Sequence, residues 1–174
     1  KMSYEEADEE INSNSTLAAL NEIAKVYQKP VIVSTHPRTQ KRIDTMKVEL
    51  HPLIELLKPL GFKDYNKLQV SAKAVLSDSG TISEESSILN FRAINIRETH
   101  ERHEAMEEST VIMTGLDSTR IIQGIEALKD QKTLNERNIF QVPDYKVPNV
   151  SIKIERIILS YINYVNRVVW QKES

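Results

Sequence analysis

Short apolar runs alternate with stretches of helical spacing along most of the chain. Four runs have the length of a buried strand and end in polar or turn-forming residues, namely VIVST (31–35), AVLS (74–77), AINI (93–96) and TVIMT (110–114). Residues 15–28 and 117–128 space their apolar side chains as amphipathic helices do, and Asp117 is expected to cap the second helix. Strands that alternate with helices predict an α/β fold with a doubly wound parallel sheet.

The C-terminal part follows a different pattern. Residues 138–150 contain two prolines and no clear periodicity, which is typical of an ordered linker. Residues 152–170, within a terminal segment of residues 151–174, have the spacing of one long helix with a wide apolar stripe. We therefore expect this helix to dock on another surface.

Composition and charge limit the classes of ligand. The chain has 174 residues, and its formal net charge of -2 gives no general attraction for nucleic acid. The absence of cysteine excludes disulfides and thiolate metal sites. No His, Asp and Glu residues have metal-site spacing, and the glycine-rich dinucleotide fingerprint is missing. The sequence thus predicts no metal and no cofactor.

The sequence also bears on location. Charged residues interrupt every apolar stretch before it reaches the length of a membrane span. The start, KMSYEEADEEINSNS, is acidic and polar, unlike a signal peptide. We therefore expect a soluble, cytoplasmic protein that has no membrane partner.

The stretch SDSGTISEE (77–85) follows a predicted strand, and in open parallel sheets ligands bind at the carboxyl ends of strands. Ser79 and Gly80 are expected at the start of the next helix, where unpaired N–H groups favour a phosphate. Thr81 and Glu84 match a capping box, and the Glu85 carboxylate is placed to accept hydrogen bonds from ribose hydroxyls. The alternative is a well-capped strand-to-helix turn without a ligand.

Two other predicted strand ends carry basic residues. The stretch RETHERHE (97–104) contains Arg97, His100, Arg102 and His103, and STHPRT (34–39) contains His36 and Arg38. For each stretch taken alone there is an alternative without a ligand: a solvated charged loop for the first and a structural His-Pro turn for the second. Since the carboxyl ends of parallel strands meet at one edge of a sheet, the three stretches together predict a site for an anionic ligand.

The segment SDSGTISEESSILNFRAINIRETHERHEAME resembles the signature of the non-hydrolysing UDP-N-acetylglucosamine 2-epimerases. That signature reads Asp-Ser-Gly-Gly-x-x-Glu-Glu, then a strand, then Thr-Glu-Arg-Pro-Glu. The capsule and O-antigen branch, which epimerises UDP-N-acetylhexosamines at C2, is more similar. It shares SDSGTISEES (77–86), STHPRT (34–39) and the pattern of residues 142–170.

The resemblance implies a GT-B-like fold of two Rossmann-like domains, of which this chain is the C-terminal, UDP-binding one. Its expected parts are an acidic, atypical segment (1–14), the UDP-binding domain (15–137), the linker (138–150) and the docking helix (151–174). The residues NSNS and the acidic residues before them stand where the family has a His-Arg-Glu-Glu-Asn loop. A phosphate-contacting histidine of the family therefore has no counterpart here.

The resemblance also implies roles for individual residues. Ser79 and Gly80, with Thr81 in place of a second glycine, are expected to bind the diphosphate through the helix start. Glu85 is expected to hold the ribose hydroxyls and Arg102 to bind a phosphate.

Other residues are expected to complete the cleft. Tyr65 stands where the family places an aromatic ring against the uracil; the alternative is an ordinary buried tyrosine. His36, Arg38 and Glu101 are predicted to line the cleft, with Glu101 beside Arg102.

The family reaction eliminates UDP to give an enzyme-bound 2-acetamidoglucal and adds UDP back to the other face of the sugar. Its acid-base carboxylates belong to the N-terminal domain, which we expect to lie outside this chain. We therefore expect a UDP-sugar-binding half of an isomerase used in polysaccharide biosynthesis, inactive alone. Expected partners are UDP or a UDP-N-acetylhexosamine, and a second copy or a complementary N-terminal half.

Two alternatives remain at this point. The first is a non-catalytic interaction or dimerisation module that is derived from the same domain. The second is the donor-binding domain of a GT-B glycosyltransferase, although ETHER (98–102) fits the epimerase pattern better.

Overall fold

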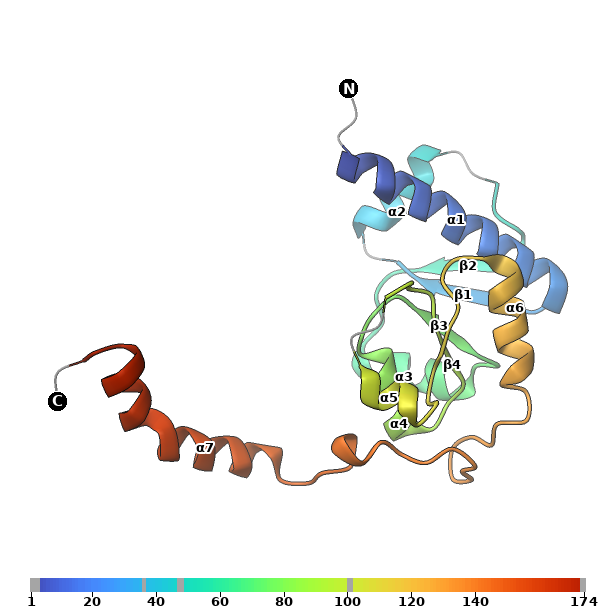
Figure 1. Ribbon diagram of the computed structural model, residues 1–174. Coiled ribbons are helices and arrows are strands. Elements are labelled where there is room, and N and C mark those ends of the chain that lie inside the picture. Colours follow the sequence, from blue (N-terminus) through green and yellow to red (C-terminus); the bar gives the residue numbers. More distant parts are fainter. Residues whose placement is uncertain (1–3, 36, 47–48, 100–101, 173–174) are drawn as a thin grey trace. The chain divides into compact units, whose positions relative to one another are not determined.

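The computed structural model describes residues 4–35, 37–46, 49–99 and 102–172 (Figure 1). The chain forms two compact units, Lys1–Val142 and Pro143–Ser174. The first unit carries all of the described strands, so it is treated first.

Two parallel ladders make up the sheets of the first unit. Strand β1 (Val31–Ser34) pairs with β2 (Ile54–Leu57), and β4 (Ala93–Asn95) lies between β3 (Val75–Ser77) and β5 (Ile112–Met113). The four strands predicted from the sequence are confirmed, whereas β2 was not predicted. The parallel pairing confirms the expected α/β fold class.

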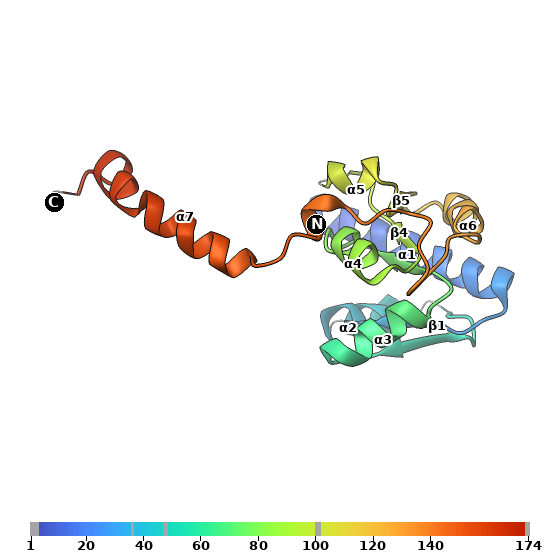
Figure 2. The same ribbon diagram turned by 90° about the horizontal axis from the view of Figure 1, so that it is seen from below.

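Helices cover both faces of the three-stranded sheet. The described residues of this unit form six helices: α1 (Tyr4–Tyr27), α2 (Pro37–Met46), α3 (Phe62–Ser71), α4 (Ile82–Leu89), α5 (His103–Glu107) and α6 (Ser118–Ala127). Both views show α1 beside α6 (Figures 1 and 2).

The two faces have separate apolar clusters. On one face, side chains of α1 and α6 pack around Ile94 of β4. On the other, Ala93 packs with Ile82 of α4 and with Phe91 and Val111. Because neighbouring residues of a strand point to opposite faces, Ala93 and Ile94 show that the sheet is covered on both sides.

Capping of α6 follows the prediction. The Asp117 carboxylate accepts a 2.8 Å hydrogen bond from the Arg120 backbone N–H. This bond satisfies one of the unpaired donors at the helix start.

The C-terminal end of α4 is held by the segment that returns from α6. Asn90 has a left-handed backbone (φ 55°), and its amide donates to the carbonyls of Leu134 (2.9 Å) and Glu136 (2.7 Å). Arg137 donates to the carbonyls of Ser87 and Ile88, each at 2.8 Å. These bonds fix the end of the helix whose start carries the SDSG turn.

The second unit is described by itself. A 3-10 turn (Pro143–Tyr145) precedes α7 (Val150–Tyr164), and a π-helical turn (Val165–Val169) continues it. The long C-terminal helix is therefore confirmed, although its regular α-helical part ends at Tyr164. Within residues 4–35, 37–46, 49–99 and 102–172, no helix has the length and apolarity needed to cross a membrane.

Replacing Asn90 by alanine should destabilise the fold. Asn90 is 2% exposed, so Asn90→Ala removes two buried hydrogen bonds and strains a left-handed backbone. We expect a loss of about 2–3 kcal/mol in the free energy of unfolding, measured in urea. Asn90→Gly, which accepts the positive φ, should lose about 1 kcal/mol less. A loss below about 0.5 kcal/mol for Asn90→Ala would contradict this account.

The phenol of Tyr27 links α1 to α6 and should make stability depend on high pH. Its hydroxyl donates to Glu126 (2.8 Å), and burial, followed by the hydrogen bond and the charge of Glu126, raises the pKa of Tyr27 from 10.0 to about 12. A raised pKa favours the neutral phenol in the folded state, so this stability is present below pH 10 and is lost as the pH rises towards 12.

This pH dependence can be measured by ultraviolet titration of the phenolates together with unfolding. Tyr27→Phe should remove the step near pH 12, and Glu126→Gln should move that step to lower pH. The unfolding free energy of Tyr27→Phe should fall less steeply with pH over this interval. An unchanged titration curve in Tyr27→Phe would contradict the assignment.

Candidate functional site

A cavity of about 540 Å³ lies at the carboxyl ends of the central strands. Residues of three loops line it: Asp78, Ser79 and Gly80 after β3; Ile96, Arg97, Glu98 and Thr99 after β4; and Leu116 after β5, with Thr16 of α1. Two of the stretches singled out in the sequence therefore face one hollow. This is the position at which open parallel sheets bind ligands.

The SDSG turn is held by hydrogen bonds within the loop. The backbone N–H of Ser79 donates to Ser77 Oγ (3.1 Å), and the N–H of Thr81 donates to Ser79 Oγ (3.3 Å). The hydroxyls of Ser79 and Thr81 lie 2.9 Å apart. The serine side chains thus shape the turn, and the glycine leaves its inner surface open.

The predicted capping box is wrong. Thr81 occupies the N-cap position of α4, but its side chain makes no capping hydrogen bond. Instead, Ser79 Oγ accepts a hydrogen bond from the N–H of Thr81, and the Glu84 carboxylate binds the guanidinium of Arg102. The Glu84 carboxylate therefore pairs with Arg102 instead of completing a capping box.

Glu84 and Arg102 form an ion pair that joins α4 to the start of α5. Arg102 Nε donates to Glu84 Oε1 at 2.8 Å, and the two side chains are 37% and 30% exposed, respectively. Within the described part of the chain, Glu84 Oε2 is buried and has no hydrogen-bond partner. The sequence pointed to Glu101 as the neighbour of Arg102, and the pairing with Glu84 was not predicted.

Tyr65, Gln69 and Glu85 form a second cluster between α3 and α4. Gln69 Nε2 donates to Glu85 Oε2 at 2.5 Å. Burial raises the pKa of the Tyr65 hydroxyl; the charges of Glu85 and Asp78 raise it further, and a hydrogen bond with Gln69 partly offsets the rise. Since Asp78 also lines the cavity, this cluster lies within electrostatic reach of it.

The predicted site residues therefore fall into three groups. Ser79 and Gly80 line the cavity. Thr81 supports the turn, while Glu85 and Arg102 belong to the two side-chain clusters.

The remaining cleft predictions cannot be placed. His36 and Glu101 lie outside the described residues, as does the side chain of Arg38, whose backbone belongs to α2. Across the described ranges, no group of three His, Asp or Glu side chains could hold a metal ion.

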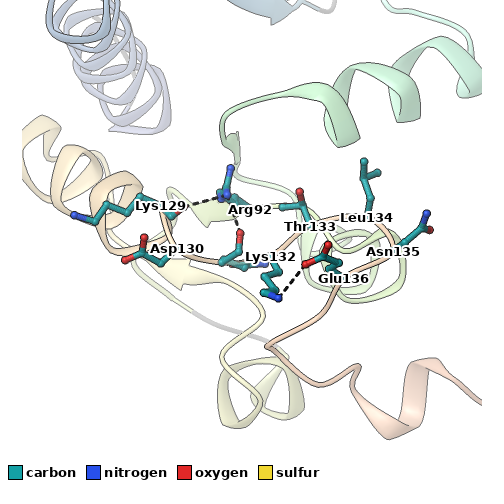
Figure 3. A pocket seen from close by; sticks show the side chains of 9 residues that line it. Arg92, Lys129, Asp130, Lys132, Thr133, Leu134, Asn135 and Glu136 are labelled. Carbon is teal, nitrogen blue, oxygen red and sulfur yellow. Dashed lines mark hydrogen bonds and ion pairs between the residues drawn. The ribbon is translucent and has the colours of Figure 1, made fainter.

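A second cavity of about 470 Å³ is lined by Arg92 and residues 129–136 (Figure 3). Arg92 donates to the carbonyls of Lys129 (3.1 Å) and Gln131 (2.7 Å), and Lys132 pairs with Glu136 at 2.9 Å. Arg92 precedes β4, so this cavity lies at the amino end of that strand, away from the SDSG turn. Because the Arg92 guanidinium donates hydrogen bonds to carbonyls just beyond the end of α6, we assign Arg92 a structural role.

Comparison with known proteins relates these features to one family. Residues 4–159 match the family model described as UDP-N-acetylglucosamine 2-epimerase. The UDP-N-acetylglucosamine 2-epimerase of Methanocaldococcus jannaschii is 30% identical over 140 residues, which are 78% of this chain and 38% of that protein. The chain thus spans well under half of this curated relative.

Solved structures show the same relation. The UDP-N-acetylglucosamine 2-epimerase from Rickettsia bellii superposes with a TM-score of 0.84 at 45% identity, over 92% of this chain and 44% of that one. The M. jannaschii enzyme, in complex with UDP-GlcNAc and UDP, gives a TM-score of 0.74 at 27% identity over 86% of this chain and 41% of that one.

The Glu84–Arg102 pair should be measurable in the isolated chain. We expect Glu84→Gln and Arg102→Gln to show a coupling energy of about 1 kcal/mol in a double-mutant cycle of urea unfolding, because both side chains are partly buried. Lys132→Gln and Glu136→Gln form the control pair, since their side chains are 58% and 72% exposed and should couple less. Equal coupling in the two cycles would contradict a special role for the Glu84 pair.

Proposed function

Because this chain belongs to the UDP-N-acetylglucosamine 2-epimerase family, we propose that it binds the UDP part of a UDP-N-acetylhexosamine and forms the UDP-binding half of a C2-epimerase. The observation that carries this proposal is the cavity at the SDSG turn, where the start of α4 meets the carboxyl ends of β3 and β4. Further support comes from the M. jannaschii relative, which superposes over 86% of this chain and was solved with UDP-GlcNAc and UDP.

The diphosphate occupies the cavity beside Ser79 and Gly80. The start of α4 carries a partial positive charge, which favours phosphate oxygens. Gly80 allows the backbone to approach the ligand closely. Arg97 lines the same cavity and adds a guanidinium.

The nucleoside extends from the cavity towards the cluster on α3 and α4. Glu85 accepts hydrogen bonds from the ribose hydroxyls, and the ring of Tyr65 lies against the uracil. Support for this direction comes from Asp78, which lines the cavity and also raises the pKa of the Tyr65 hydroxyl.

Arg102 binds a phosphate with its guanidinium oriented by Glu84. The carboxylate holds Nε at 2.8 Å, which fixes the plane of the group. A planar guanidinium that is held in this way can make paired bonds to phosphate oxygens.

Catalysis requires more than this chain provides. General acid-base groups must lie within hydrogen-bond reach of the protons that they move, and the family places those carboxylates in its other domain. We therefore propose that the chain alone does not epimerise UDP-GlcNAc. A complementary N-terminal half or a second copy completes the site. The complete enzyme acts in a cytoplasmic pathway of capsule polysaccharide synthesis. Epimerisation of UDP-GlcNAc by the purified chain would contradict the proposal that the chain is inactive alone.

One observation favours a second candidate function. Helix α7 carries many large apolar side chains, among them Ile154, Ile158 and Ile162, at helical spacing. In the described part of the second unit, the π-helical turn (Val165–Val169) continues this helix directly. An interaction or dimerisation module that uses this helix is therefore the alternative.

The proposal predicts saturable binding of UDP by the purified chain. In isothermal titration calorimetry we expect Glu85→Ala and Arg102→Ala each to weaken UDP binding by about 10- to 100-fold, since each removes a charge-assisted hydrogen bond. Glu136→Ala and Arg120→Ala remove the same charges from exposed positions outside the cavity and should change the dissociation constant less than about threefold.

Two outcomes would count against it. Wild-type chain that fails to bind UDP at millimolar concentrations would leave the interaction module as the better account. Binding that survives in both Glu85→Ala and Arg102→Ala would place the nucleotide elsewhere on the molecule.

A further inference from the structure

Gln69 is an unusual residue for its position. It is only 3% exposed, yet glutamine is mostly a surface residue. It lies four residues after Tyr65 on α3, so both side chains are on one face of that helix. No local pattern marks it in the sequence, because an isolated glutamine in KDYNKLQ (63–69) belongs to no motif.

The hydrogen bonds of Gln69 are unequally satisfied. Its Nε2 donates to Glu85 Oε2 at 2.5 Å. Its Oε1 is buried and, among the residues that the structure describes, has no hydrogen-bond partner. A buried acceptor without a partner is unfavourable, and an apolar side chain of similar size would avoid that cost. The bond to Glu85, together with the hydrogen bond to Tyr65, is therefore what distinguishes glutamine from methionine or leucine here.

An amide is suited to holding a carboxylate that must still accept other bonds. A lysine or arginine at this position would neutralise the charge of Glu85, whereas the amide leaves it in place. An ionised carboxylate offers about four acceptor sites, so a single bond from Gln69 leaves sites for a ligand. The bond also removes rotational freedom that the ligand would otherwise have to remove.

We propose that Gln69 is a positioning residue that orients the Glu85 carboxylate towards the ribose hydroxyls and so sets the preference for a ribonucleotide. This inference rests on the proposed binding of UDP, and it adds a residue that touches Glu85 rather than the ligand. A site that is built to bind a hydroxyl discriminates strongly against an analogue that lacks it, because its polar groups are then left unpaired.

The test compares the dissociation constants of UDP, 2′-deoxy-UDP and 3′-deoxy-UDP by calorimetry. We expect the wild-type chain to bind UDP about tenfold more tightly than at least one deoxy analogue. Gln69→Met should weaken UDP binding by about tenfold and change the dissociation constant of that deoxy analogue by less than about twofold. The variant would then no longer discriminate between the two ligands. Glu85→Ala should lose the discrimination in the same way. Lys67→Met, on the exposed side of α3, is the matched control and should keep it.

A second variant separates positioning from packing. Gln69→Glu has the same size but places a carboxylate against Glu85, in a cluster where the Tyr65 hydroxyl responds to the charges of both Glu85 and Asp78. We expect its discrimination to be lost near pH 8 and regained towards pH 5, where one carboxyl of the pair is protonated and can donate. Because all three ligands carry the same diphosphate, its own titration cancels in the ratio.

The outcomes distinguish the two levels of the argument. If the wild-type chain binds no UDP, or binds all three ligands equally, the proposed function or its ribose contact fails. If the wild-type chain discriminates and Gln69→Met still does, the role of Gln69 is overturned and UDP binding stands. A Gln69→Met variant that weakens all three ligands equally shows a structural role only, which also overturns the inference.

Discussion

The candidate site depends on the fixed position of α4. Its start carries the SDSG turn, and its first turn contains Glu84 and Glu85, which bind Arg102 at the start of α5 and Gln69 of α3, respectively. Its C-terminal end is held by Arg137, whose guanidinium donates to two carbonyls of the last turn. A shift of this one helix would move the cavity wall and both side-chain clusters together, because each of them includes residues of α4 or of the turn before it.

Small buried side chains allow α4 to pack closely against the rest of the fold. Ser83, Ser86 and Ser87 are all buried, and they are small enough to let the backbone approach the layer beneath. Ser86 Oγ donates to the carbonyl of Ser83, while Ser87 Oγ accepts the N–H of Val142. The helix is thus anchored by polar contacts that an apolar helix would lack.

Much of the fold could be predicted from the sequence, because buried parallel strands leave a clear local signal. The four β-branched runs and the Asp117 cap were found in this way. Strand β2 (IELL, 54–57) was missed since it contains a glutamate and is followed by KPLG, which weakens the apolar pattern. The short α5 and the π-helical end of α7 depend on tertiary context that periodicity does not carry.

The site was less predictable than the fold for a different reason. A turn such as SDSG is contiguous, so its residues and their position at a strand end are visible in the sequence. Arg102 pairs with Glu84, which lies 18 residues earlier in the chain and on another helix. Gln69 binds Glu85 across 16 residues. Pairings of this kind are set by how helices pack, and no local pattern encodes them.

The two adjacent glutamates of α4 show how one sequence element serves two electrostatic purposes. Consecutive residues of a helix point about 100° apart, so Glu84 reaches Arg102 and Glu85 reaches Gln69. The Glu84 carboxylate is paired with a guanidinium, whereas the Glu85 carboxylate is bound by a neutral amide. Asp78 and Glu98 add two more carboxylates to the cavity lining, against the single guanidinium of Arg97. Attraction for a diphosphate therefore cannot come from net charge, in the cavity or in a chain of net charge -2. In the proposed complex it comes from individual groups, namely the guanidinium groups of Arg97 and Arg102 and the partial positive charge at the start of α4.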